Sequence, residues 1–189
     1  MARPPIRGRF RSLAFTLILL GALGRLAPHP PNFTPVGSAS LFAGARLPGW
    51  QAYLVPLLVM AITDPILGAL HGFAAFSRAT PLIYASLLAH ALIGRWLLRA
   101  SENGLRIGLA AFLCSLQFFL VTNLAVWLGG RLYPLAWDGL AACYAAALPF
   151  FGRTLAGDLV YSGLLFGLHA WLSRKVFVSE RVALPGKAT

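Results

Sequence analysis

The sequence predicts an all-α fold, a polytopic membrane helix bundle with about six transmembrane helices. The first observation is composition: 58% of the residues are hydrophobic and 11% are charged, with a mean hydropathy of +0.73. Soluble domains carry roughly 25% charged residues. The second is the length of 189 residues, which accommodates about six helices of ~20 residues in one domain. The third is that the apolar runs are continuous, whereas strands of a membrane β-barrel alternate.

The first expected helix covers residues 11–26 and follows a basic segment, residues 1–10. An apolar run after several arginines is also typical of a signal peptide, and Ala22-Leu23-Gly24 resembles a cleavage site. Because several more apolar runs follow, we interpret the run as a retained helix. Together with the later helices it forms one transmembrane domain, residues 11–175, followed by a tail, residues 176–189.

A proline-rich segment, residues 25–35, separates the first two apolar runs. Its four prolines in eleven residues exclude a helix interior, because each removes a backbone N–H and restricts the residue before it. The same segment carries Arg25, His29, Asn32 and Thr34, which are dense polar chemistry in so apolar a chain. We therefore interpret it as a rigid lid over the helix bundle.

The remaining helices differ in length. Residues 36–47 are too few for a ~30 Å hydrocarbon core and are rich in small residues, which let helix backbones approach closely, so we expect a short interior helix. Longer helices are expected at residues 50–70, 80–98, 105–128 and 150–173. Residues 129–149 form the longest connection, and its Ala-rich part is compatible with a short interfacial helix.

The positive charge predicts membrane orientation rather than nucleic-acid binding. The net charge is +11, but the basic residues cluster at the ends of apolar runs, where they set topology. With six spans and an inner N-terminus, twelve basic residues are cytoplasmic: Arg3, Arg7, Arg9, Arg11, Arg46, Arg95, Arg99, Arg106, Arg174, Lys175, Arg181 and Lys187. Four are outside: Arg25, Arg78, Arg131 and Arg153. This asymmetry predicts an inner, plasma-membrane protein with both termini in the cytoplasm.

The same topology gathers polar residues in the outer half of the bundle. Asp64 falls late in an outward-running helix, and Thr154, Asp158 and Tyr161 share one face of an inward-running helix because their spacing is i, i+4, i+7. These residues therefore converge beneath the proline-rich segment. We expect an outward-facing polar cavity there.

Ionisable groups inside a membrane are costly and face the bundle interior or water, so each one is a candidate functional residue. Here they could form ion pairs that hold helices together, bind a ligand or ion, or take part in catalysis. The candidate ligand-binding residues are Arg25, His29, Asn32, Thr34, Asp64, Asn123, Trp127, Arg153, Asp158 and Tyr161. His90 and Gln117 are instead expected to make polar contacts between helices.

No metal site or cofactor is expected. The two cysteines, Cys114 and Cys143, form no CxxC pair or Cys/His cluster, and no second histidine lies near His29 at metal-site spacing. An enzyme is not expected either. The segment before Asp158 lacks the first glycine of the Gly-x-Gly-Asp pattern, and the chain has no Gly-x-Ser-x-Gly or His-Glu-x-x-His motif.

Four motifs resemble an uncharacterised family of bacterial multi-pass membrane proteins. They are Arg-Leu-x-Pro-His-Pro-Pro-Asn-Phe-Thr-Pro-Val-Gly (residues 25–37), Asp-x-Ile-Leu-Gly (within 63–68), Phe-Leu-Val-Thr-Asn-x-x-Val-Trp (119–127) and Leu-Pro-Phe-Phe-x-x-Thr-Leu-x-Gly-Asp-Leu-Val-Tyr-Ser (148–162). The likeness covers about residues 13–171 and implies no known activity.

More distantly, the expected architecture is similar to the substrate-binding S components of energy-coupling factor uptake systems. That resemblance implies a small-molecule substrate and docking to a coupling subunit with ATPases. The small-xxx-small docking pattern falls on the second helix, at Ala39 and Ala43, and not on the first.

We therefore expect a small-solute-binding or transport protein that contacts membrane lipid and no nucleic acid. A membrane scaffold or assembly subunit without a solute is the alternative. An intramembrane enzyme of the aspartyl type is a further one, because paired carboxylates can divide the roles of acid and base.

Overall fold

The computed structural model describes residues 6–72, 74–77 and 79–183, and within these ranges the chain forms six helices and no strand. The helices are α1 (Ile6–Gly24), α2 (Val36–Arg46), α3 (Gln51–His71), α4 (Thr80–Leu98), α5 (Gly104–Leu128) and α6 (Trp137–Ala183). The all-α prediction is confirmed. Arg3, Arg78 and Lys187, which entered the charge count, lie outside the described residues.

Four of the helices, α3 to α6, are long and apolar enough to cross a membrane. The apolar part of α1, Arg11–Gly24, is shorter. With 11 residues, α2 is only about 16 Å long and cannot cross a hydrocarbon core of about 30 Å. The described chain thus has the expected six helices, of which four are long and apolar enough to span, and the expectation of a short second helix is confirmed.

The last helix is longer than its sequence pattern predicts. Residues 137–149 are part of α6, which continues without interruption past Ser173. The expected long connection and separate interfacial helix are therefore wrong. Alanine favours helix, and Pro149 removes only one backbone donor, a loss that membrane helices tolerate. Of the two predicted terminal segments, residues 1–5 and 184–189 lie outside the described residues, and the division into segments stays a prediction.

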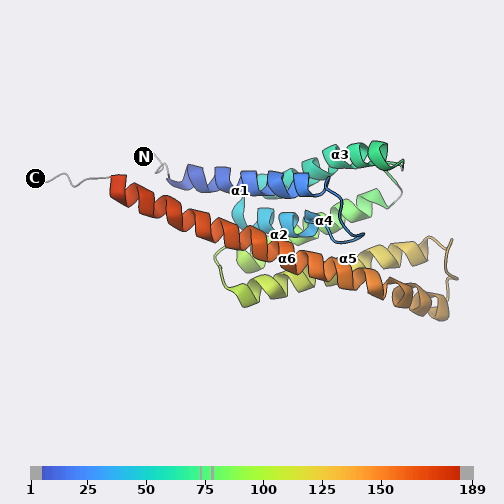
Figure 1. Cartoon of the computed structure of the whole chain (residues 1–189). Coiled ribbons are helices and arrows are strands. Elements are labelled where there is room, and N and C mark those ends of the chain that lie inside the picture. The colour runs from blue at the N-terminus through green and yellow to red at the C-terminus, as the bar shows by residue number, and fades with distance from the viewer. Residues whose placement is uncertain (1–5, 73, 78, 184–189) are drawn as a thin grey trace, which may run out of the picture.

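The connections divide between the two ends of the bundle (Figure 1). The start of α1, the end of α6 and the α2–α3 and α4–α5 connections lie at one end, called here the terminal end. The α3–α4 and α5–α6 connections lie at the other, the far end. In the same view α1 stops well short of the far end, and α2 turns back beside it. The first two helices therefore form a hairpin within the terminal half.

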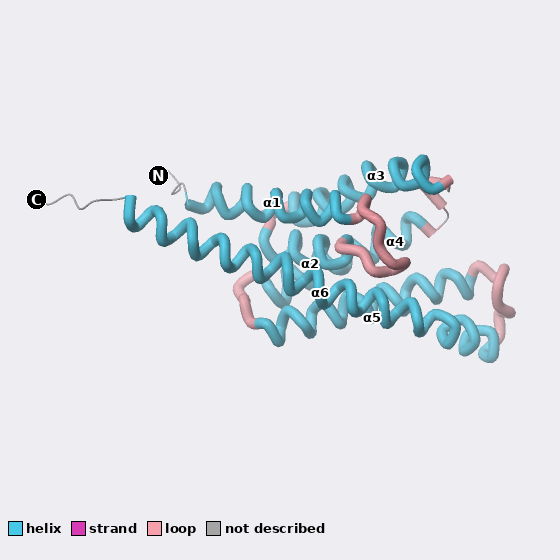
Figure 2. Tube along the Cα trace, viewed as in Figure 1, coloured by secondary structure: helices cyan, strands magenta, loops and turns pink. Residues whose placement is uncertain are grey.

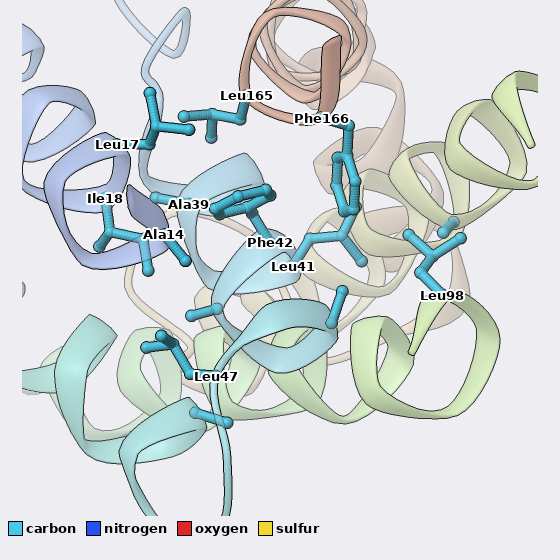
Figure 3. Packing of buried hydrophobic residues seen from close by; sticks show 14 of the residues in the cluster. Ala14, Leu17, Ile18, Ala39, Leu41, Phe42, Leu47, Leu98, Leu165 and Phe166 are labelled. Carbon is cyan, nitrogen blue, oxygen red and sulfur yellow. The ribbon is translucent and has the colours of Figure 1, made fainter. Parts of the chain in front are cut away.

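The centre of the packing is α2, which contacts all five other helices. Figure 3 shows Phe42 of α2 lying among Leu17, Leu165 and Phe166, which belong to α1 and α6. The rings of Phe42 and Phe166 meet edge to face, with centroids 5.0 Å apart. Nearly all of α2 is buried, which explains why the sequence there is apolar on every side.

The helices α2 and α4 touch backbone to backbone. A Cβ atom added to Gly44 would overlap the Ala91 carbonyl, and one added to Gly94 would overlap the Leu41 carbonyl. Any larger residue at either glycine would force the two helices apart. The small residues of the sequence therefore serve as predicted, as a close helix contact.

Candidate functional site

The proline-rich segment, residues 25–35, packs against the bundle and is partly exposed, at Ala27, Pro28, Pro30, Pro31 and Asn32. Figure 2 shows this loop across the space between α3 and the α5–α6 pair. The ring of Phe33 packs against Tyr161 of α6 at 5.4 Å between centroids, and a Cβ added to Gly157 would lie 3.3 Å from Phe33 Cα. The segment is held to α3 through Arg25 and to α6 through Phe33. That it forms a lid over the cavity stays a prediction.

The first polar cluster joins the proline-rich segment to α3 and α4 through Arg25. Its Nη2 donates to Asp64 Oδ1 at 2.6 Å, and its Nη1 donates to the Thr63 hydroxyl. The Tyr84 hydroxyl donates to the other carboxylate oxygen, Asp64 Oδ2, at 2.8 Å. The two charged side chains are only 15% and 11% exposed. Arg25 and Asp64 therefore neutralise one another about two turns before the end of α3.

The second polar cluster joins α2, α5 and α6 around Asp158, which is 3% exposed. The Ser115 hydroxyl donates to Asp158 Oδ2 at 2.7 Å. The Ser38 hydroxyl lies 2.9 Å from the Asp158 main-chain oxygen and 3.4 Å from Oδ1, and it accepts from Ser162 at 3.2 Å. Asp158 Oδ1 also lies against Gly37, where a Cβ would overlap it. The carboxylate thus faces the first turn of α2, whose N-terminal dipole favours negative charge.

Contacts between α4 and α5 complete the polar interior. His90 is 1% exposed, and its Nε2 lies 2.9 Å from the Cys114 carbonyl oxygen. Since that partner is an acceptor, Nε2 donates the hydrogen bond. The Gln117 amide donates to Ser86 at 3.1 Å. Both predicted interhelical contacts are confirmed.

The two clusters border one cavity of about 370 Å³. Its deep wall includes Gly37, His90 and Asp158, and its lining reaches Ser77 and Thr80 at the far end. The polar lining also includes Arg25, Asn32, Thr34, Asp64, Tyr84 and Thr154. The apolar lining includes Val36, Met60, Ile83, Leu87 and Phe118. Mixed linings of this kind, with a few polar groups converging on an apolar space, are typical of small-molecule sites.

Five of the ten candidate residues line this cavity: Arg25, Asn32, Thr34, Asp64 and Asp158. Asn32 holds a positive φ of 65°, an unusual conformation that asparagine tolerates better than most residues. Asn123 lines a second cavity of about 300 Å³ between α5 and α6, to which Asn32 also belongs. Its amide donates to Phe119 O at 2.8 Å.

The other four candidate residues line neither cavity. The ring of His29 lies between two backbone oxygens of its own segment, those of Arg25 and Pro30. Trp127 Nε1 donates to Pro134 O at 2.9 Å and so fixes the α5–α6 connection. Tyr161 packs on Phe33, and Arg153 is exposed.

Several residues of the site carry no individual sequence signal. Tyr84, Ser38 and Ser115 lie in apolar runs, where a single hydroxyl is as compatible with a lipid-facing position as with an interior one. Only their partners, Asp64 and Asp158, mark them as functional candidates. In the part of the chain that the structure describes, no group of three or more His, Cys, Asp or Glu residues could hold a metal ion.

Comparisons with known proteins place the chain in a family but give no activity. Neither the curated proteins nor the solved structures include a match. A family model does match, over residues 7–183, which is most of the chain. The chain belongs to that family, which is described as a family of unknown function (DUF6580).

Proposed function

We propose that the protein binds or transports a small solute through the cavity that Arg25, Asp64 and Asp158 line. The cavity itself carries the proposal. Its volume of about 370 Å³ falls within the roughly 300–1,000 Å³ of small-molecule sites, and polar groups from the proline-rich segment, α3, α4 and α6 converge on it.

The proposal includes an orientation. The basic residues concentrate at the terminal end, where Arg46 donates to the carbonyls of Leu98 at 2.9 Å and Ser101 at 3.1 Å. By the positive-inside rule this end is cytoplasmic, in a bacterial inner membrane, and the far end faces outward. The cavity would then receive its solute from outside, and both termini would be cytoplasmic.

The resemblance to S components extends the proposal to partners. It predicts a coupling subunit with ATPases, alongside membrane lipid, and this stays a prediction. The scaffold alternative has one observation in its favour, since one polar cluster holds the proline-rich segment to two helices and the other connects three helices. A bound solute distinguishes the two functions, because a scaffold has no use for the cavity.

A matched pair of tryptophan substitutions tests solute binding. Ala75 lies half-buried in the cavity lining near the far end, whereas Ala136 is exposed in the α5–α6 connection and lines none of the cavities described here. Unmodified protein and the Ala136→Trp control, purified and then denatured, are expected to release about one equivalent of a small molecule to mass spectrometry. Ala75→Trp is expected to release less than about a tenth of that amount, because the indole fills the entry.

Two results would count against the proposal. One is folded, unmodified protein that releases no small molecule. The other is an Ala75→Trp protein that releases as much as the control. Either would favour the scaffold function.

A further inference from the structure

The charges that border the cavity do not cancel. Arg25 and Asp64 form an ion pair, and both terminal nitrogens of the guanidinium already donate to α3. The pair therefore presents no free cation to a ligand. Asp158 remains as the third charged residue in the lining.

Asp158 has no cationic partner among the side chains that the structure describes. The ion pair found there is that of Arg25 with Asp64. Three hydroxyls and the first turn of α2 surround the Asp158 carboxylate, and each of these is neutral or only partly charged. A carboxylate buried to this extent is costly unless a counter-ion or several hydrogen bonds compensate it.

Neutral donors compensate the Asp158 carboxylate. Oδ2 accepts a hydrogen bond of 2.7 Å from Ser115. The Ser38 hydroxyl lies 3.4 Å from Oδ1 and has a nearer acceptor in the Asp158 main-chain oxygen at 2.9 Å, and the Ser38 backbone N–H is a further donor to the carboxylate. A carboxylate has about four acceptor sites. The carboxylate therefore keeps acceptor capacity, and the donors that the structure describes neutralise none of its charge.

The remaining lining suits a cation as well. Phe118 and Tyr84 border the same cavity, and the faces of aromatic rings attract ammonium groups. The Tyr84 hydroxyl is oriented by its bond to Asp64, which fixes the ring at the cavity wall. A carboxylate and two aromatic rings around an apolar space match a ligand with one positive charge and an apolar body.

We propose that the cavity takes a small organic cation, an ammonium-bearing solute, and that the Asp158 carboxylate is its counter-ion. The proposal rests on the proposed solute-binding function and names the chemical class of the solute. An anionic solute is excluded by the same charges, because it would face the Asp158 carboxylate without a free arginine to offset the repulsion.

Three probes of nearly the same shape test the charge preference. They are para-fluorobenzylammonium, para-fluorobenzyl alcohol and para-fluorobenzoate, whose binding to purified full-length protein is followed by fluorine NMR with empty detergent micelles as the blank. The ammonium probe is expected to bind at least about tenfold more tightly than the alcohol, and the benzoate more weakly than either. This comparison uses the unmodified chain and so does not depend on the folding of a variant.

A matched pair of variants then tests whether the preference for the ammonium probe depends on Asp158. Asp158→Asn is expected to reduce the preference for ammonium over alcohol to within about threefold, whereas Asp138→Asn, at an exposed position of the same helix, leaves it unchanged.

If the alcohol or the benzoate binds as tightly as the ammonium probe, the cation assignment is wrong while the solute-binding function stands. An ammonium preference that survives in Asp158→Asn overturns the role of Asp158. Failure of all three probes to bind contradicts the cavity as a solute site, and with it both proposals.

Discussion

Replacing Asp64 with alanine is expected to destabilise the protein by about 3 kcal/mol, one of the two largest single effects on this fold. The substitution leaves the Arg25 guanidinium without its counter-ion and the Tyr84 hydroxyl without its acceptor, both in a part-buried setting. Truncating one partner of such a pair costs more than the pair contributes, because the other charge stays desolvated. Thermal and denaturant unfolding of the purified protein in detergent measure the change.

A control and a second variant separate charge burial from loss of packing. Asp138→Ala, at an exposed position, is expected to change stability by no more than about 0.5 kcal/mol. Combining Asp64→Ala with Arg25→Leu removes the orphaned charge and is expected to restore more than about half of the loss. If Asp64→Ala is as stable as the control in thermal and denaturant unfolding, the Arg25–Asp64 pair does not stabilise the fold. Failure of the double variant to recover would mean that the loss comes from packing.

Gly44→Leu is expected to have an effect of similar size, about 3 kcal/mol or a failure to fold. Its Cβ would occupy the space of the Ala91 carbonyl, so α2 would have to move away from α4. That displacement also moves Gly37 and Ser38, which lie against Asp158 at the cavity floor. The yield of monodisperse protein and its unfolding temperature measure the effect.

The matched control is a glycine in open space on a neighbouring helix. At Gly163 of α6 a Cβ would meet nothing within 4 Å. Gly163→Ala is expected to leave stability unchanged or to raise it by about 0.5 kcal/mol, because alanine restricts the unfolded chain and favours helix. Gly44→Leu protein as stable as this control would show that α2 and α4 are not in backbone contact.

The fold class follows from the sequence because it depends on average properties. Charge content and the length of apolar runs predict a membrane bundle, and small residues predict the close packing of α2. Helix ends depend on weaker local signals. The sequence predicts a helix boundary at Pro149, yet α6 continues through it, because one missing backbone donor does not by itself end a membrane helix.

The charged residues of the site can be predicted from the sequence, but their hydrogen-bond partners cannot. Asp64, Asp158 and Arg25 stand out because charge inside a membrane requires compensation, and the structure brings all three to one cavity. Which atoms compensate them depends on the angle between helices, which no local pattern encodes. Thus Tyr84 and Ser115 were missed, and Arg153, which has the right charge and depth, is exposed.

A polar cavity that opens to water at the far end of the membrane bundle is expected to admit a thiol reagent from outside, and cysteine labelling in intact cells measures this access. Thr34 lines the cavity and is half-buried, whereas Glu102 lies in the α4–α5 connection at the terminal end. The native Cys114 and Cys143 are 1% and 2% exposed, so their background labelling is low.

Thr34→Cys is expected to react with a small, membrane-impermeant, positively charged thiol reagent added to intact cells. Glu102→Cys is expected to react only after the membranes are opened. This pattern would establish a water-filled path from the outer face to the proline-rich segment. A Thr34→Cys protein that folds but stays unlabelled from outside, or reacts only after the membranes are opened, would contradict a cavity that opens outward.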